Sequence, residues 1–170
     1  LKESQRLDRT VKSFLQFARP RERDPESMDI ARLLAEDVEL LRNSDEVLPG
    51  HEIRLKLEPE SATIVADLDQ ISQLFWNLAR NALQAMPDGG SLDLTGRLEG
   101  GRYRMEFRDT GKGMSEKERT ELFQPFKTFF GTGTGLGMAI VYRIVEEHGG
   151  NIEVDSRPGK GTVINVDLPV

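Results

Sequence analysis

The stretch from Gly131 to Met138 constrains the fold most, because a glycine-rich segment runs there directly into an apolar run with helical spacing. It reads Gly-Thr-Gly-Thr-Gly-Leu-Gly-Met, and the apolar run continues to Val145. Such a segment leaves backbone N–H groups free at a helix N-terminus, where the helix dipole favours an anion. The pattern predicts a phosphate-binding turn, and a flexible surface linker is the alternative that the same composition allows.

Composition limits the class of protein. A chain of 170 residues with 37% hydrophobic and 31% charged residues is expected to form one domain with a core, with room for a short appendage. No apolar run approaches the roughly 20 residues that a bilayer-spanning helix needs. The absence of cysteine excludes disulfides and thiolate metal sites. A net charge of −6 argues against a nucleic-acid partner and predicts that a divalent cation accompanies any bound phosphate.

Residues 1–20 are predicted to form an amphipathic helix that ends at Pro20. Its seam follows three- and four-residue spacing and would consist of Ser4, Leu7, Val11, Phe14 and Ala18. A helix this short is not stable alone, so we expect it to pack on a partner. The charged stretch 21–27 is predicted to be a linker to a domain over residues 28–170. Because the helical pattern is already running at Leu1, the chain is expected to be a piece of a longer protein.

The longest predicted helix covers residues 67–86 and carries an unusual polar face. Its apolar stripe would consist of Ile71, Leu74, Phe75, Leu78, Ala82 and Ala85. Four carboxamides share another face: Gln73, Asn77, Asn81 and Gln84. An ordinary solvated face explains Gln73 and Gln84. Two Asn residues in adjacent turns favour a functional reading, because Asn is a poor helix former and its side-chain oxygen can ligate Mg²⁺.

The remaining pattern alternates strands and helices. Helices are predicted over residues 29–42, 115–123 and 136–147, and strands over residues 53–58, 63–66, 91–98, 103–108, 151–156 and 162–168. The strand at 103–108 runs into Asp109. Either the carboxylate of Asp109 lies at the mouth of a cleft, or Asp109 is an ordinary turn residue. The segment 123–130 holds four phenylalanines without a regular period, and serves either as a lid or as part of the core.

Taken in chain order, these motifs resemble the N, G1, F, G2 and G3 boxes of sensor histidine kinases. The matching residues are Asn77-x-x-x-Asn81, Asp109-x-Gly111-x-Gly113, Phe123-x-x-Phe126, Gly133-x-Gly135-Leu136-Gly137 and Gly159-x-Gly161-Thr162. These kinases belong to the GHKL (Bergerat) ATPase superfamily, with gyrase, a class of heat-shock chaperones and the MutL repair proteins. The resemblance covers about residues 28–170. Residues 1–19 resemble the second helix of the dimerisation and phosphoacceptor hairpin. The amino-acid sequences of segments 14–20 and 77–85 are most similar to those of nitrogen-regulatory and pilus-regulatory kinases.

The resemblance implies an α+β fold, a two-layer α/β sandwich with a mixed sheet and helices on one face, preceded by one dimerisation-type helix. It also implies ATP and Mg²⁺ as cofactors. Asp109 would accept a hydrogen bond from the adenine amino group, and Asn81 would hold Mg²⁺, with Asn77 assisting at the phosphates. The other implied cofactor-binding residues are Arg80, Gly111, Gly113, Gly133, Thr134, Gly135, Leu136, Gly137 and Thr162.

The implied activity is transfer of the ATP γ-phosphoryl to a His on a dimerisation helix outside this sequence. Hydrolysing members of the superfamily carry a Glu where this chain has Asn77, and a carboxamide cannot act as a base, which favours transfer over hydrolysis. His51 and His148 are expected to be structural, so the phosphoacceptor is expected to be absent. The segment 127–130 replaces the usual Phe-Thr-Thr-Lys, which leaves Lys127 without an assigned role.

The implied setting is cytoplasmic, and the full-length protein would be a homodimer that passes the phosphoryl group to the receiver domain of a response regulator. Any attachment to an inner membrane would come only through segments outside this sequence. Two alternatives stay open at this stage. One is an ATP-hydrolysing machine of the gyrase, heat-shock chaperone or MutL kind, and the other is a non-catalytic nucleotide-binding module.

Overall fold

A computed structural model describes residues 7–8, 11–12, 14–15, 17–19, 22–130 and 133–170. Residues 7–8, 11–12, 14–15 and 17–18, called here the N-terminal helical segment, are all helical, as predicted. The rest of the predicted helix over residues 1–20, with Ser4 and Pro20, lies outside the described residues. The same is true of Gly131 and Thr132 in the glycine-rich stretch.

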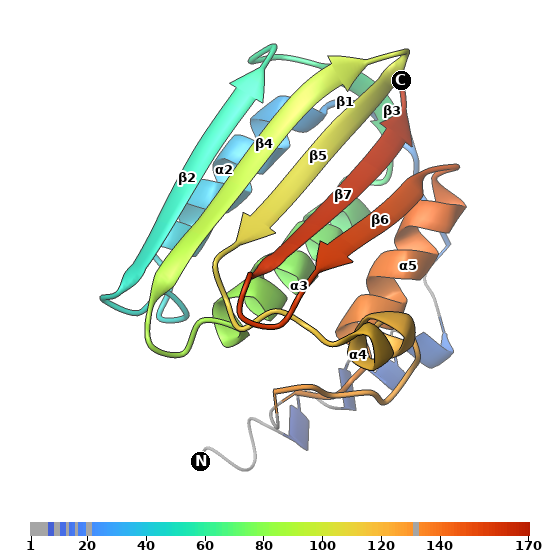
Figure 1. Cartoon of the computed structure of the whole chain (residues 1–170). Coiled ribbons are helices and arrows are strands. Elements are labelled where there is room, and N and C mark those ends of the chain that lie inside the picture. The colour runs from blue at the N-terminus through green and yellow to red at the C-terminus, as the bar shows by residue number, and fades with distance from the viewer. Residues whose placement is uncertain (1–6, 9–10, 13, 16, 20–21, 131–132) are drawn as a thin grey trace.

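The framework is a five-stranded mixed sheet in the order β2-β4-β5-β7-β6 (Figure 1). Its strands are β2 (His51–Glu58), β4 (Gly90–Glu99), β5 (Arg102–Asp109), β6 (Asn151–Ser156) and β7 (Thr162–Pro169). Strand β2 runs parallel to β4, and every other neighbouring pair is antiparallel. The mixed sheet that the resemblance implies is therefore confirmed.

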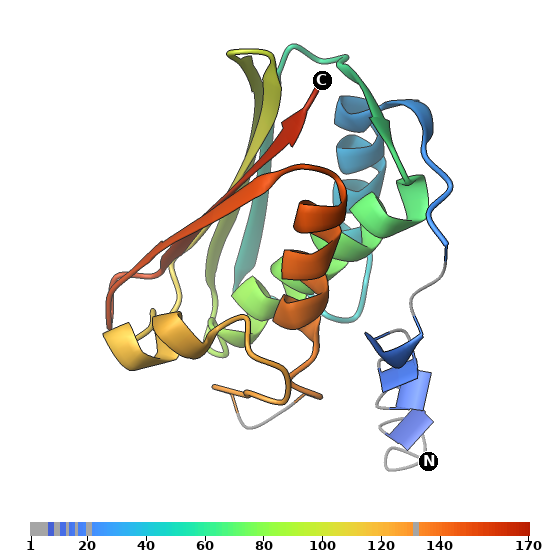
Figure 2. The ribbon, with the colours of Figure 1, turned by 90° about the vertical axis from the view of Figure 1, so that its right-hand side faces the viewer.

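Three helices cover one face of this sheet, which gives the two layers visible from the side in Figure 2. They are α2 (Ile30–Arg42), α3 (Leu68–Gln84) and α5 (Gly137–Glu147), and a short helix, α4 (Glu116–Glu121), lies near the start of α5. The core fills the space between the layers, with α3 in the middle against β5 and α5. Burial of this apolar surface is the main force that holds α3 and α5 side by side.

Local sequence signals fix where the helices begin. The Asp29 carboxylate accepts from the N–H of Arg32 and caps α2, and the Asp67 carboxylate accepts from the N–H of Gln70 and caps α3. Ser115 and Glu118 form a capping box at the start of α4, each side chain accepting from the other's backbone N–H. The start of α3 is thus set at Leu68, which determines which side chains of the helix face α5.

The sequence did not predict strand β1 (Glu26–Asp29), which begins inside the stretch expected to be a linker. It pairs antiparallel with β3 (Thr63–Ala66) in a separate two-stranded sheet, and β3 does not pair with β2. Asp29 explains the pairing, because its carboxylate also accepts from the Ser61 hydroxyl and the Ala62 N–H. A four-residue strand has too short a pattern to be recognised before that partner is known.

Tyr103 on β5 carries an unusual buried hydroxyl. The side chain is fully buried, and its Oη has no hydrogen-bond partner among the described residues. Gly96 on β4 leaves the space for it, since a Cβ there would overlap Oη. Burial first, and the charge of Asp29 second, raise the pKa of Tyr103 to about 12.

Replacing Tyr103 with Phe is expected to raise the free energy of unfolding by about 1 kcal/mol, because an unsatisfied buried hydroxyl is removed. The folded pKa lies above the usual value of 10.0, so the wild type should lose stability as pH rises from 10 to 12, whereas the variant should not lose this contribution. Urea unfolding at pH 7 and at alkaline pH measures both effects, with exposed Tyr142→Phe as the control at pH 7. A clear loss of stability at pH 7 would contradict the assignment.

In the part of the chain that the structure describes, no helix is both long and apolar enough to cross a bilayer.

Candidate functional site

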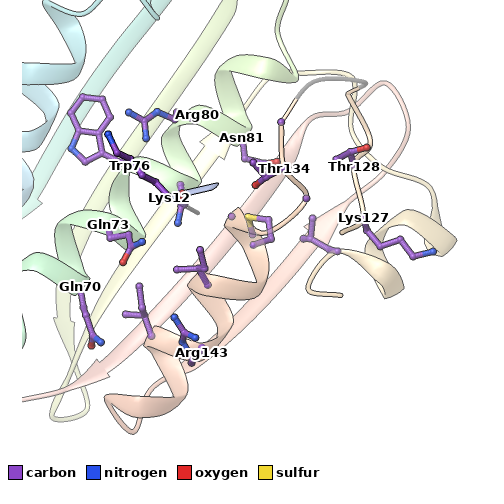
Figure 3. Close-up of a pocket in the computed structure, with 18 of the residues that line it drawn as sticks. Lys12, Gln70, Gln73, Trp76, Arg80, Asn81, Lys127, Thr128, Thr134 and Arg143 are labelled. Carbon is purple, nitrogen blue, oxygen red and sulfur yellow. The ribbon is translucent and has the colours of Figure 1, made fainter. Parts of the chain in front are cut away.

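A cavity of about 1000 Å³ lies between α3, α5 and the phenylalanine-rich segment 123–130, and the N-terminal helical segment also lines it (Figure 3). This volume is at the upper end of the range for small-molecule and cofactor sites. Seven of the residues predicted to bind a cofactor line it: Asn77, Arg80, Asn81, Gly133, Thr134, Gly135 and Gly137. The structure therefore brings the helix carboxamides and the described part of the glycine-rich stretch to one site.

The α3 wall presents all four carboxamides of the predicted polar face to this cavity, including Gln73 and Gln84, for which an ordinary solvated face was the favoured interpretation. Asn77 is the most informative of them. Its Nδ2 is buried and has no hydrogen-bond partner within the described chain, and its Oδ1 would lie 3.5 Å from a Cβ at Gly137. A buried donor without a partner is costly, so an acceptor on a ligand is the natural occupant.

The start of α5 lies directly beside Asn77 at the cavity wall. The helix begins at Gly137, and its N-cap residue, Leu136, makes no side-chain hydrogen bond to the first turn. Leu136 is itself buried, and its N–H donates to Thr134 Oγ1 at 3.3 Å. A helix N-terminus without a side-chain cap leaves N–H groups and the positive end of the dipole for an anion. Together with the Asn77 donor, this arrangement fits the oxygens of a phosphate chain.

The phenylalanine-rich segment is anchored at the side of the cavity. The Phe126 N–H donates to the Gly135 carbonyl at 2.8 Å, and Phe126 adopts a left-handed φ of 64°. A Cβ at Gly135 would lie only 2.6 Å from the Phe126 carbonyl carbon, so this close approach requires glycine. Lys127 turns away to Glu121 on α4, with 3.1 Å between Nζ and Oε2. The structure thus gives Lys127 a contact outside the cavity.

Phe129 and Phe130 line the cavity and are held by Lys112. Its Nζ donates to the Phe129 carbonyl at 2.7 Å and lies 4.5 Å from the centroid of the Phe130 ring. Phe130 and Gln84 also line a second cavity of about 420 Å³, together with Gly111 and Lys112. The two cavities therefore share a wall made by α3 and the aromatic segment.

Asp109 ends β5 and lies behind these cavities, since it lines neither of them. The residue is only 8% exposed, and its Oδ1 accepts from the Gly111 N–H at 2.8 Å. Burial raises the pKa of its carboxyl, and hydrogen bonds from the backbone of Gly111 and Thr162 oppose the rise. Its predicted adenine contact stays a prediction.

Gly113, Leu136 and Thr162 also do not line either cavity. Gly113 and Gly161 have φ angles of 67° and 72°, and a Cβ on either would overlap a backbone carbonyl oxygen, that of Arg157 or of Asp109. The buried Ser156 Oγ binds Thr162 Oγ1 at 2.9 Å and accepts from the Met114 N–H. These residues pack the backbone that supports Asp109.

Magnesium fits the donor set as an ion carried by a phosphate ligand. No group of three or more His, Cys, Asp or Glu side chains within the described ranges could hold a metal ion. Asn81 offers a carboxamide oxygen at the cavity wall, and Mg²⁺ commonly uses one or two protein oxygens together with water and substrate phosphates. The ion would neutralise phosphate charge, because three of the cations that line the cavity are already in ion pairs: Lys12 with Asp8, Arg80 with Glu46 and Lys127 with Glu121.

Both histidines make hydrogen bonds to backbone groups. His51 accepts from the Leu48 N–H through Nδ1, and its Nε2 lies 2.7 Å from the Met86 carbonyl. His148 accepts from the Asp67 N–H through Nε2, at 3.1 Å, and its Nδ1 lies 2.8 Å from the Ile144 carbonyl. These contacts agree with the structural role that the sequence predicts for both.

Several residues of the site were not predicted from the sequence. Trp76 lines the cavity beside Arg80, and three side chains of the first 20 residues do so as well: Lys12, Leu15 and Arg19. Two features of the sequence could have indicated that Trp76 belongs to the site. It directly precedes Asn77, and the apolar stripe of its helix is complete without it. No local pattern connects the N-terminal residues with α3, because that contact depends on the path of the chain between them.

Comparison with known proteins agrees with this geometry. The family model described as "Histidine kinase-, DNA gyrase B-, and HSP90-like ATPase" matches residues 66–170. The chain is 34% identical over 169 residues to sporulation kinase E of Bacillus subtilis (strain 168), which covers 99% of this chain and 23% of that protein. It is 34% identical over 172 residues to sensor histidine kinase ZraS of Escherichia coli (strain K12), with 99% and 36% covered.

A solved structure, full-length ShkA in complex with AMPPNP, shares 32% identity with a TM-score of 0.80. The alignment covers 94% of this chain and 35% of that one. The chain thus spans about a quarter to a third of the length of these three proteins.

Proposed function

The chain belongs to the family of histidine kinase-, DNA gyrase B- and HSP90-like ATPases, and on this basis we propose that it is the ATP-binding catalytic part of a sensor histidine kinase. The observation that carries the proposal is that two sets of hydrogen-bond donors, one on α3 and one at the start of α5, lie together in the cavity between these helices. The Asn77 Nδ2 on α3 is buried and has no hydrogen-bond partner among the described residues, and the same residues provide no side-chain cap for the adjacent N-terminus of α5. Two sets of donors that converge on one space suit a polyphosphate.

In this assignment the residues of the cavity bind and orient ATP. Asn77 donates to the phosphates, the N–H groups at Gly135 and Gly137 hold them at the start of α5, and Asn81 offers its oxygen to Mg²⁺. The bound metal ion neutralises charge on the phosphates and so favours phosphoryl transfer. Positioning and charge neutralisation supply most of the catalysis in such a reaction.

The identity of residue 77 favours transfer to a protein over hydrolysis. Its carboxamide cannot remove a proton from water. Among the described residues that line the cavity, Asp67 and Asp69 are the carboxylates, and Asp67 is committed to the N–H groups of Asp24 and Gln70. Asp69 lies in the first turn of α3, about two helical turns before Asn77. A site without a base beside the phosphates suits an imidazole acceptor, which is nucleophilic without assistance.

The proposal extends to partners by way of the relatives. Sporulation kinase E and ZraS are named as kinases, and ZraS as a sensor histidine kinase. We therefore assign the acceptor His to a dimerisation helix of a longer homodimeric protein, and the next acceptor to the receiver domain of a response regulator. A cytoplasmic site of action and the nitrogen-regulatory or pilus-regulatory subtype stay predictions.

Incubation with γ-labelled ATP, Mg²⁺ and a separate hairpin that carries the acceptor His tests this function. The expected result is label on the hairpin that is lost in acid and stable in base, with little free phosphate. Free phosphate without labelled hairpin would instead assign the chain to the hydrolysing members of the family. Binding of ATP without either product would assign it to the non-catalytic modules.

A further inference from the structure

One wall of the large cavity is an aromatic and cationic pair on α3. Trp76 and Arg80 lie one turn apart and both line the cavity (Figure 3). The guanidinium carbon of Arg80 lies 5.0 Å from the centroid of the Trp76 ring. Its Nε is 2.9 Å from both carboxylate oxygens of Glu46, which belongs to the loop between α2 and β2. Arg80 is thus held by an acid at the edge of a proposed polyphosphate site.

The Trp76 ring is a fixed platform. Its Nε1 donates to Asp37 Oδ1 at 3.2 Å, and the ring packs edge-on against Phe75 with centroids 5.8 Å apart. Asp37 is buried on α2 and also accepts from the Ser72 hydroxyl at 3.0 Å. The indole is therefore locked between α2 and α3, and only the outer part of the pair is free to change partner.

The Arg80–Glu46 ion pair is exposed enough to exchange. The side chains are 47% and 39% exposed, and exposed pairs of this kind contribute little net stability. Arg80 also directly precedes Asn81, whose oxygen is the proposed ligand of Mg²⁺. A guanidinium at this place is close to the phosphates of the proposed ligand, and phosphates bind guanidinium as carboxylates do.

We propose that Glu46 competes with the nucleotide phosphates for Arg80 and thereby sets the affinity of the site for ATP. Without nucleotide, Glu46 holds the guanidinium over Trp76. With ATP bound, the phosphates take the guanidinium and Glu46 is released to solvent. This inference rests on the proposed function and adds a regulatory carboxylate to it. The competing explanation is that the pair only ties the α2–β2 loop to α3.

Titration with a non-hydrolysable ATP analogue and with AMP, both with Mg²⁺, tests the competition in the wild type and in Glu46→Gln. We expect Glu46→Gln to bind the ATP analogue about two- to fivefold more tightly, in line with the small strength of an exposed ion pair, and to bind AMP unchanged. Glu39→Gln is the matched control, because it removes the same charge from an exposed pair with Arg42 on α2, and it should alter neither ligand.

Trp76 supplies a second readout, because it is the single tryptophan of the chain. Its fluorescence should change on binding of the ATP analogue in the wild type and less on binding of AMP. In Arg80→Gln the Glu46→Gln substitution should have no further effect on affinity. Equal affinity of Glu46→Gln and wild type for the ATP analogue, or the same change for AMP, would overturn the competition while leaving the proposed function intact. No binding of the ATP analogue by the wild type would overturn both.

Discussion

Replacing Asn81 with Ala is expected to reduce phosphoryl transfer to a supplied His-bearing hairpin by roughly 100-fold or more. Asn81 offers the carboxamide oxygen to the ion that neutralises the phosphates, and loss of one preorganised electrostatic contact commonly costs this much. Mg²⁺ dependence of the remaining activity should move to higher metal concentration. Initial rates at several Mg²⁺ concentrations measure both effects.

The control for Asn81→Ala is Asn151→Ala, which removes an exposed carboxamide that does not line the cavity and should leave the rate unchanged. AMP binding by Asn81→Ala should persist, since AMP lacks the terminal phosphates. If Asn81→Ala transfers phosphoryl at the wild-type rate with the wild-type Mg²⁺ dependence, the assignment of Asn81 as a ligand of Mg²⁺ is contradicted.

Gly161→Ala is expected to lower the free energy of unfolding by about 3 kcal/mol or more. The residue has a left-handed φ of 72°, and a Cβ would overlap the Asp109 carbonyl oxygen, which belongs to the backbone and cannot turn aside. Overlap with backbone adds to the conformational cost of a non-glycine residue in this region. Urea unfolding followed by circular dichroism measures the loss.

Gly159 provides the matched comparison in the same turn. Its φ is 74°, but a Cβ there meets nothing within 4 Å, so Gly159→Ala should lose only the conformational term, about 1 kcal/mol. A similar loss in both variants would show that overlap with Asp109 is unimportant. A larger loss at Gly161 would confirm that the last glycine motif supports the end of β5 by close backbone packing.

The sequence predicted the elements whose signals are local. Asp29, Asp67 and Ser115 are the first residues of predicted helices, and in the structure each caps the first turn of its helix. The carboxamide face of α3 follows from helical spacing alone, and it lines the cavity as a unit. These predictions succeed because each depends on residues within a few positions of one another.

The features that depend on distant contacts were not predictable in the same way. Strand β1 exists because it pairs with β3, more than thirty residues later in the chain. The place of Asp109 behind the cavities follows from packing against Thr162 and Gly161, which a motif cannot show. A Cβ at Gly113 would overlap the Arg157 carbonyl oxygen, a contact that the motif does not show, and the predicted role of Gly113 at the adenine pocket stays a prediction.

The aromatic part of the site shows the same limit. Lys112 and Phe130 belong to different segments of the sequence, but the fold places the ammonium group of Lys112 over the ring of Phe130. Trp76 joins the cavity because Asp37 on another helix holds its indole nitrogen. Neither contact has a sequence pattern of its own.

Calorimetric titration of the wild type with a non-hydrolysable ATP analogue in the presence of Mg²⁺, beside the corresponding GTP analogue, tests the central claim most directly. We expect one ATP analogue to bind per chain, with tighter binding when Mg²⁺ is present and with little or no binding of the GTP analogue. No heat of binding with the ATP analogue, or equal affinity for the two nucleotides, would contradict the assignment of the cavity between α3 and α5 to Mg²⁺-ATP.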